Sequence, residues 1–138
     1  MTPTTSEEPI LITEQDHSRL TSLLRSADPS EVDQHLVDEL ERANIVPSSE
    51  IPPDVVTMNS RVTYVDVATG GDSTVQLVYP HDAGPAGGKL SVFAPIGAAL
   101  LGLSVGQSIQ WALPNGRVRT VRVTSVTYQP EAAGHWEL

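Results

Sequence analysis

Apolar residues recur at helical spacing in the first third of the chain. Thr13 is typical of a residue that caps a helix, and we expect this helix to begin at Glu14 with Asp16 at its third position. The apolar stripe of the helix is narrow and consists of Leu20, Leu23 and Leu24. The segment Ser26-Ala27-Asp28 interrupts the pattern and predicts the end of the helix.

A second helical pattern follows directly. Asp28 and Pro29 suit a cap and a first turn, and Glu31 lies three residues after the cap. The predicted helix covers Ser30–Asn44, which is about 22 Å at the usual rise per residue. Val32, Leu36 and Leu40 recur at intervals of four, and Val37 and Ala43 widen this apolar stripe. The two helices predict a short antiparallel hairpin, which we expect to rest on the remainder of the protein at its open end because isolated short helices are marginal.

The apolar period changes from helical to strand-like after a proline-rich segment. Residues 47–53 contain three prolines, so we interpret them as a linker. The predicted organisation is a helical hairpin over residues 1–46, this linker, and a second domain over residues 54–138.

The apolar pattern of residues 54–138 predicts an α+β fold with an antiparallel twisted sheet of four or five strands. The predicted strands cover residues 60–68, 74–79, 108–113 and 117–128. The apolar parity shifts within the first of them, which indicates a bulge or burial on both faces, and within the last, which indicates a kink. One short apolar helix over residues 95–101 should pack across the sheet, with Gly102 permitting a left-handed stop, and residues 81–89 should form a loop.

Net charge is concentrated in the first part of the chain. The formal charge is −9 overall, and residues 1–50 carry eleven acids against three arginines. An acidic protein is repelled by phosphate backbones, so direct DNA or RNA binding is disfavoured. The acidic surface either faces a basic partner or serves only solubility. With no cysteine, no long apolar run and no basic N-terminal leader, we expect a cytoplasmic protein.

No constellation of side chains indicates catalysis or a metal site. The four histidines, interpreted as surface residues, are scattered at His17, His35, His81 and His135. Arg117, Arg119 and Arg122 form a basic cluster that either meets an acidic partner or makes local ion pairs on a solvated sheet face.

Three acids gather at the tip of the predicted hairpin: Asp28, Glu31 and Asp33. Carboxylates in such a place can hold Mg²⁺ through one or two oxygens. Asp28 and Glu31 also suit a structural role as a capping pair, and the sequence leaves both interpretations open.

The chain resembles the GreA/GreB superfamily of bacterial RNA polymerase factors in several segments. The most specific is Ala94–Gly102, Ala-Pro-Ile-Gly-Ala-Ala-Leu-Leu-Gly. The others are Pro53–Val62, Leu77–Pro80 and Tyr128–Gly134, the last reading Tyr-Gln-Pro-Glu-Ala-Ala-Gly. The first and last of these three segments are similar to the branch of regulators of nucleoside diphosphate kinase.

This resemblance implies a coiled-coil hairpin followed by an FKBP-like domain that binds RNA polymerase at the rim of its secondary channel. In Gre factors the loop entering the short helix makes this contact. The corresponding residues here are Phe93, Ala94, Pro95, Ile96 and Gly97. Many Gre proteins carry a polar or acidic residue in place of Phe93. In this chain Phe93 could serve either as an interface anchor or as a core residue.

The resemblance also implies a mechanism that differs from that of Gre factors, whose hairpins are about twice as long. The short hairpin should dock without reaching the active centre, so we expect a non-enzymatic regulator, most simply a monomer without a cofactor, that competes with Gre factors. The family name implies an effect on nucleoside diphosphate kinase, which could be indirect. Two alternatives remain: weak transcript cleavage using Asp28 and Glu31, and prolyl isomerisation on an FKBP-like fold.

Overall fold

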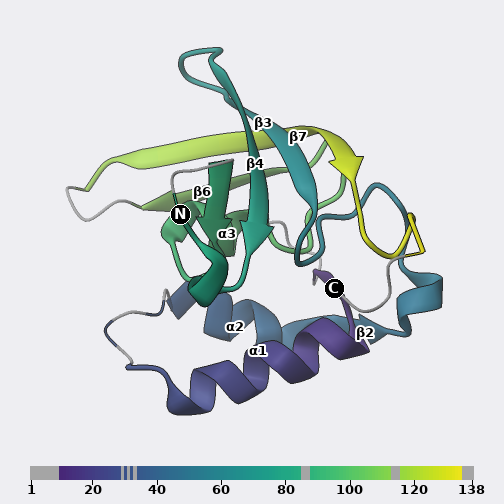
Figure 1. Cartoon of the computed structure of the whole chain (residues 1–138). Helices are drawn as coiled ribbons and strands as arrows, with labels where there is room; N and C mark the ends of the chain where they lie inside the picture. Colours follow the sequence, from purple (N-terminus) through teal and green to yellow (C-terminus); the bar gives the residue numbers. More distant parts are fainter. Residues whose placement is uncertain are drawn as a thin grey trace.

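A twisted five-stranded sheet forms the centre of the molecule (Figure 1). The computed structural model describes residues 10–28, 30, 32, 34–84, 88–112 and 116–134. The sheet has the order β5-β4-β3-β7-β6. Its strands are β3 (Arg61–Asp66), β4 (Asp72–Val78), β5 (Lys89–Ser91), β6 (Ser108–Ala112) and β7 (Val118–Tyr128).

Four strands of the sheet are the predicted ones, and they pair antiparallel. β3 lies between β4 and β7, and β7 also pairs with β6. β5 was not predicted, and it runs parallel to β4, with Leu90 opposite Leu77. The sheet is therefore mixed rather than wholly antiparallel.

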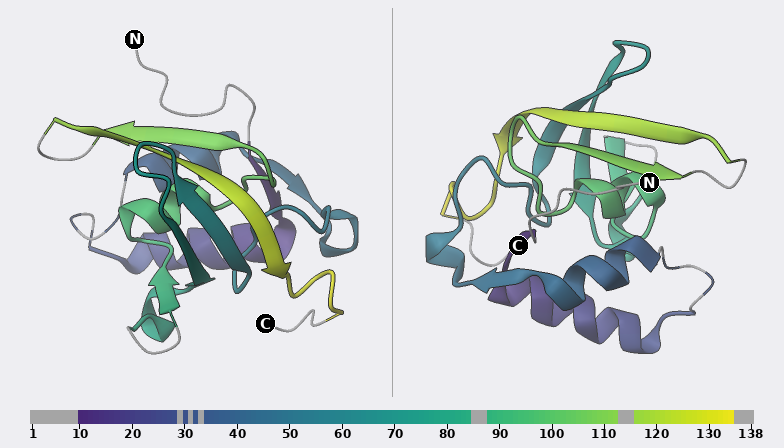
Figure 2. Two further views of the ribbon diagram at one scale, coloured as in Figure 1. Left: turned by 90° about the horizontal axis from the view of Figure 1, so that it is seen from above. Right: turned by 180° about the vertical axis from the view of Figure 1, so that it is seen from behind.

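The helical hairpin lies across one end of the sheet, with α3 (Pro95–Leu100) between them (Figures 1 and 2). α1 covers Glu14–Ser26, and the Thr13 hydroxyl accepts a hydrogen bond from the Asp16 amide at 3.1 Å. The predicted start, cap and end of this helix are thus confirmed.

The second helix is shorter than predicted. α2 covers Gln34–Arg42, so it begins four residues later than expected and spans about 14 Å rather than 22 Å. The Asp28 carboxylate accepts hydrogen bonds from the amide and the hydroxyl of Ser30, at 3.0 and 2.9 Å. This contact agrees with the predicted cap, because Ser30 has 3-10 helical conformation, but the α-helix itself begins only at Gln34.

Two short strands join the ends of the hairpin. β1 (Leu11–Thr13) and β2 (Asn44–Val46) pair in parallel, with Ile12 opposite Ile45. The prediction that the second helix continues to Asn44 is therefore wrong, because Asn44 is the first residue of β2 and pairs with β1. This pairing fixes the start of α1 beside the end of α2.

Buried side chains from the hairpin, the sheet and α3 form one continuous hydrophobic cluster. The hairpin contributes Leu20, Leu36 and Leu40, each at most 5 % exposed. Burying one leucine stabilises a fold by about 1.5–3 kcal/mol. The expectation that the hairpin rests on the remainder of the protein is confirmed, and the contact extends along both helices.

β7 is bulged where it follows β3. The register shifts on either side of the pairs Val62–Val126 and Thr63–Ser125, so that Thr124 and Thr127 are skipped. Their hydroxyls donate to the carbonyls of Thr63 and Arg61, at 3.1 and 3.3 Å. β7 is irregular as predicted, but its shifts lie beyond Val123 rather than between Val118 and Val121. Both extra residues belong to β7, and β3 pairs with β4 without a shift, so a bulge in β3 is not found.

Candidate functional site

Residues 93–97 lead from β5 into the first turn of α3, and two contacts with Ser91 hold the start of this segment. The Ser91 side chain accepts from the Phe93 amide at 3.0 Å, and the Ser91 carbonyl accepts from the Ala94 amide at 3.1 Å. Phe93 and Ile96 are half-buried and pack against the core cluster, and Ala94 is half-buried. Phe93 thus touches the core while part of its ring stays accessible to a partner.

The structure places the tip acids at the far end of the hairpin. Asp28 is exposed, and its hydrogen bonds from Ser30 lower the pKa of its carboxyl group, which is therefore ionised at neutral pH. Glu31 and Asp33 lie outside the described residues. In the part of the chain that is described, no three His, Asp or Glu side chains are close enough together to hold a metal ion.

A buried carboxylate fixes the hairpin to the sheet domain. Asp16, in the first turn of α1, is 2 % exposed. Its Oδ2 accepts from the Met58 amide at 3.1 Å, and its Oδ1 accepts from the Tyr79 hydroxyl at 3.4 Å. We call Asp16, Met58 and Tyr79 the hairpin junction.

Burial controls the ionisation of the hairpin junction. Removal from water raises the pKa of Asp16 to about 6, opposed mainly by the hydrogen bond from Met58. The charge of Glu131 raises that pKa further, while the charge of Arg19 and the Thr13 hydroxyl lower it. Burial likewise raises the pKa of Tyr79, so its hydroxyl remains a donor.

The Asp16 carboxyl group predicts a pH dependence of stability. Because its folded pKa of about 6 exceeds the ordinary 3.8, the folded state binds more protons between these values, and stability falls as pH rises through this window. The full shift corresponds to about 3 kcal/mol. Replacing Asp16 with asparagine should remove this loss. Urea unfolding at pH 4 and pH 7.5 should therefore show the variant gaining about 2–3 kcal/mol on the wild type between the two pH values.

This comparison depends only on the change with pH. Any constant effect of the amide on the Met58 and Tyr79 contacts cancels between the two measurements. A stability difference that is the same at both pH values would contradict a titrating Asp16.

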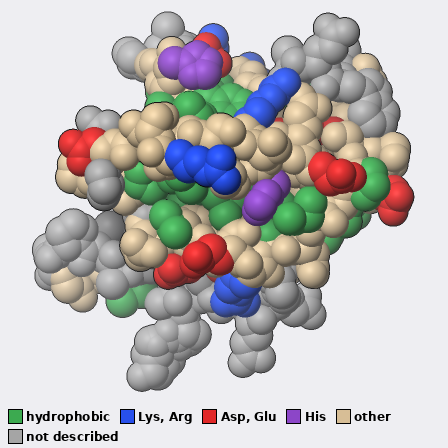
Figure 3. Space-filling model, turned by 90° about the horizontal axis from the view of Figure 1, so that it is seen from below, with side chains coloured by type: hydrophobic (Ala, Val, Ile, Leu, Met, Phe, Trp, Pro, Cys, Tyr) green, Lys and Arg blue, Asp and Glu red, His purple; other side chains and the backbone are tan. Residues whose placement is uncertain are grey.

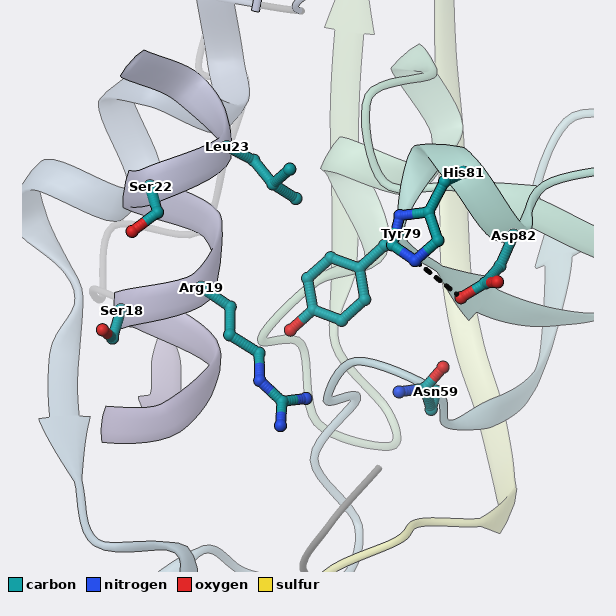
Figure 4. Close-up of a pocket in the computed structure, with 8 residues that line it drawn as sticks. All are labelled: Ser18, Arg19, Ser22, Leu23, Asn59, Tyr79, His81 and Asp82. Carbon is teal, nitrogen blue, oxygen red and sulfur yellow. Dashed lines mark ion pairs between the residues drawn. The ribbon is translucent and has the colours of Figure 1, made fainter. Parts of the chain in front are cut away.

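An open groove of about 590 Å³ runs beside the hairpin junction (Figure 4). One wall belongs to α1 and consists of Ser18, Arg19, Ser22 and Leu23. The opposite wall consists of Asn59, Tyr79, His81 and Asp82. The Tyr79 and His81 rings are stacked, with centroids 6.1 Å apart, and His81 pairs with Asp82 at 3.3 Å. We call this hollow the junction groove.

A second groove, the outer groove, lies between the helices on the face turned away from the sheet (Figure 3). Its apolar lining includes Leu24, Val37, Ala43 and Ile45. Ile45 is 47 % exposed, and the His17 ring hydrogen-bonds the Leu40 carbonyl at 3.3 Å. His17 is thus half-buried rather than a plain surface residue.

Basic residues of β7 make at least one local ion pair. Arg119 donates to the Asp66 carboxylate at 2.9 Å, which lowers the pKa of Asp66. Of the two interpretations of the arginine cluster, this contact favours local pairing on the sheet face.

Two buried acids were not predicted as site residues. Asp16 was assigned only to the first turn of α1, and Glu39, which is 4 % exposed, was not singled out. Among the described residues, Glu39 Oε2 has no hydrogen-bond partner. The signal was present, because Asp16 lies four residues before Leu20 and Glu39 three after Leu36, so both fall on the apolar stripes.

Comparison with known proteins identifies both parts of the chain. Residues 51–128 match the C-terminal region of the transcription elongation factors GreA/GreB, and residues 8–46 match the N-terminal region of Rnk proteins. The regulator of nucleoside diphosphate kinase of Escherichia coli K12 is 42 % identical over 137 residues, which cover 96 % of this chain and 99 % of that protein. GreA of Rhodospirillum rubrum is 35 % identical over 83 residues, 60 % of this chain and 53 % of GreA.

A solved structure has the same arrangement. The GreA/GreB elongation factor of Nitrosomonas europaea is 41 % identical, with a TM-score of 0.71, over 88 % of this chain and all of that one. Within the described residues, no helix is long and apolar enough to cross a membrane. The chain belongs to the GreA/GreB family, in the branch of the regulators of nucleoside diphosphate kinase.

Proposed function

We propose that this protein regulates transcription by binding RNA polymerase at the rim of its secondary channel without stimulating transcript cleavage. The observation that carries the proposal is the hairpin, whose helices span about 20 Å and 14 Å and pack along the sheet domain. An arm of this length, fixed at the hairpin junction, leaves its tip near the domain that docks.

The docking contact is assigned to residues 93–97. The half-buried Phe93 and Ile96 offer apolar surface beside the start of α3, and the Ser91 contacts hold the loop in one conformation. A preorganised apolar loop binds with little ordering cost. In this proposal residues 54–138 form an FKBP-like docking domain, residues 1–46 a short coiled-coil arm, and residues 47–53 the linker.

In this proposal the tip of the hairpin plays no part in transcript cleavage. Asp28 is ionised and exposed, but its carboxylate is engaged by Ser30. We propose a cytoplasmic monomer that does not contact DNA directly. An effect on nucleoside diphosphate kinase would then follow from altered transcription rather than from contact with the enzyme.

Ala94 provides a direct test of the docking loop. It occupies the N-cap position of α3 with extended backbone angles and makes no side-chain cap. Aspartate there should cap the helix and preserve the fold, yet place a charge within the docking surface. We expect Ala94→Asp to weaken RNA polymerase binding about thirtyfold or more, because an unpaired interfacial charge costs about 2 kcal/mol or more.

Serine at the same position is the matched control. Ala94→Ser supplies a capping oxygen without charge and should bind like the wild type. Binding can be measured by biolayer interferometry with immobilised core polymerase. Equal affinity of the aspartate and serine variants would remove residues 93–97 from the interface.

A further inference from the structure

Strand pairing divides the side chains of the five-stranded sheet between two faces. Residues that lie opposite each other on neighbouring strands share a face, and successive residues of one strand alternate between faces. Tyr64 and Val123 are paired and buried, and they belong to the hydrophobic cluster that also contains the helix residues. We call the other side of the sheet the outward face.

Three rows of paired residues cross the outward face. They are Lys89–Gln76–Arg61–Tyr128, then Thr74–Thr63–Ser125, then Asp72–Val65–Arg122–Ser108. The hydroxyl groups of Thr63 and Thr74 are hydrogen-bonded to each other at the surface, at 2.8 Å. The side chains of all three basic residues are exposed, and the rows contain a single acid. The outward face is therefore polar and positively charged.

Arg122 differs from its neighbour Arg119 in the face that it occupies. Arg119 lies three residues earlier on β7, on the opposite face, where it donates to Asp66 at 2.9 Å. Arg122 lies between Val65 of β3 and Ser108 of β6. The local ion pair of Arg119 therefore does not involve the outward face.

The three basic residues of the outward face lie within reach of one short polypeptide segment. Lys89 is two strands from Arg61, which separates their Cα atoms by about 10 Å. Arg122 is one strand beyond Arg61 and, at the level of Val65, about 13 Å farther along the sheet. An extended segment of about seven residues is long enough to pass all three.

We propose that the outward face binds an acidic segment of a partner protein through Arg61, Lys89 and Arg122. Carboxylates form charge-assisted hydrogen bonds with guanidinium and ammonium groups, and the hydroxyl and amide side chains between them also donate. Eleven of the seventeen acidic residues of the chain lie within residues 1–50, so repulsion elsewhere directs an acidic partner to this face. This inference does not depend on RNA polymerase binding.

Two features favour an acidic polypeptide over a nucleic acid. Sheets that bind single strands stack bases on aromatic side chains, whereas Tyr128 is the only aromatic residue in the three rows. A nucleic-acid strand also carries charge well beyond the face, where the net charge of −9 opposes its binding. A short acidic segment can confine its charge to the outward face.

Fluorescence anisotropy with the full chain tests this assignment. The probe is a fluorescein-labelled peptide of alternating glutamate and serine, used at low ionic strength because salt screens exposed charges. We expect the combined substitution Arg61→Gln and Arg122→Gln to weaken peptide binding about tenfold. The matched control combines Arg25→Gln and Arg42→Gln, which remove the same charge from exposed positions on the hairpin. This control should bind the peptide within about twofold of the wild type.

Two further measurements make the outcome decisive. Arg61→Lys combined with Arg122→Lys keeps both charges and should retain most of the affinity of the wild type. Equal affinity of the two glutamine variants, or no binding of the peptide to the wild type, would overturn the proposal. A labelled oligouridine that bound more tightly than the peptide, and lost binding in the Arg61→Gln and Arg122→Gln variant, would assign the face to nucleic acid and refute an acidic partner.

Discussion

Gly97→Ala is expected to lower the free energy of unfolding by about 3 kcal/mol. A Cβ at this position would lie 2.1 Å from the Ser91 carbonyl oxygen and 3.0 Å from Val92 Cα. Both are backbone atoms that hydrogen bonds hold in place, so they cannot move aside cheaply. Alanine would otherwise favour a helix by about 1 kcal/mol, and the steric cost exceeds this gain. Urea denaturation followed by circular dichroism measures the change.

Gly71 provides the control for this substitution. A Cβ there would meet only the Thr69 hydroxyl oxygen, at 3.5 Å, and the site is exposed. Gly71→Ala should therefore change the free energy of unfolding by no more than about 0.5 kcal/mol. If Gly97→Ala also left the free energy of unfolding unchanged, the inference that α3 packs closely against the Ser91 and Val92 backbone would be wrong.

The close approach at Gly97 also determines how docking experiments must be interpreted. Gly97 belongs to the proposed docking loop, yet its substitution would disturb the packing of α3 on β5. A loss of polymerase binding in a Gly97 variant would therefore indicate a damaged fold and could not be assigned to a lost interface contact. Ala94 separates the two effects, because its substitution adds charge at a position that tolerates a cap.

Local sequence signals were sufficient for most elements of the fold. Thr13 caps α1 as predicted, because the Thr13 hydroxyl and the Asp16 amide that donates to it lie within one helical turn of each other. Gly102 has a φ of +81°, the left-handed conformation expected of a residue that ends a short helix. The four strands of the two antiparallel pairs β3–β4 and β6–β7 were likewise predicted from local sequence patterns.

Contacts between distant segments were not predictable from periodicity. β1 and β2 are three-residue strands, and their pairing joins Ile12 with Ile45, far away in the sequence. β5 is equally short, and its parallel partner determines its conformation. The start of α2 was misplaced because Asp28 bonds the amide of Ser30, which has 3-10 helical conformation, and such a cap does not show where the α-helix begins.

The candidate site was predictable only in part. Residues 93–97 remain a proposed docking site, which the sequence suggests because Ala94–Gly102 resembles a segment specific to the family. The hairpin junction could not be predicted, because the partner of Asp16 is the main-chain amide of Met58, which no side-chain pattern reveals. An acid on an apolar stripe indicates that some buried partner exists, without identifying it.

With backtracked transcription complexes, we expect this protein alone to leave the RNA at its original length. Cleavage by Gre-type factors requires tip carboxylates that reach the catalytic metal of the polymerase. Here α2 spans about 14 Å, and the buried Leu20 and Leu36 pack both helices against the sheet domain. Gel analysis of end-labelled RNA after incubation with saturating protein measures the outcome.

Added to a subsaturating amount of GreA, the same protein should slow GreA-stimulated cleavage. If both proteins bind one rim, mass action predicts about a tenfold fall in rate when this protein is present at ten times its Kd. Ala94→Asp should inhibit only at correspondingly higher concentration, whereas Ala94→Ser should inhibit like the wild type. Cleavage that stays at full rate would mean that the two proteins do not share a site.

The tip acid Asp28 decides between docking and residual cleavage. If the protein alone shortened the RNA, and Asp28→Asn abolished that activity while leaving polymerase binding intact, a tip carboxylate would be reaching the metal despite the short arm. Asparagine keeps an oxygen that can accept from the Ser30 amide, so the turn after α1 should survive the change. In the docking mechanism this variant competes with GreA as well as the wild type does, because the interface lies in residues 93–97 and the carboxylate contributes only to its own turn.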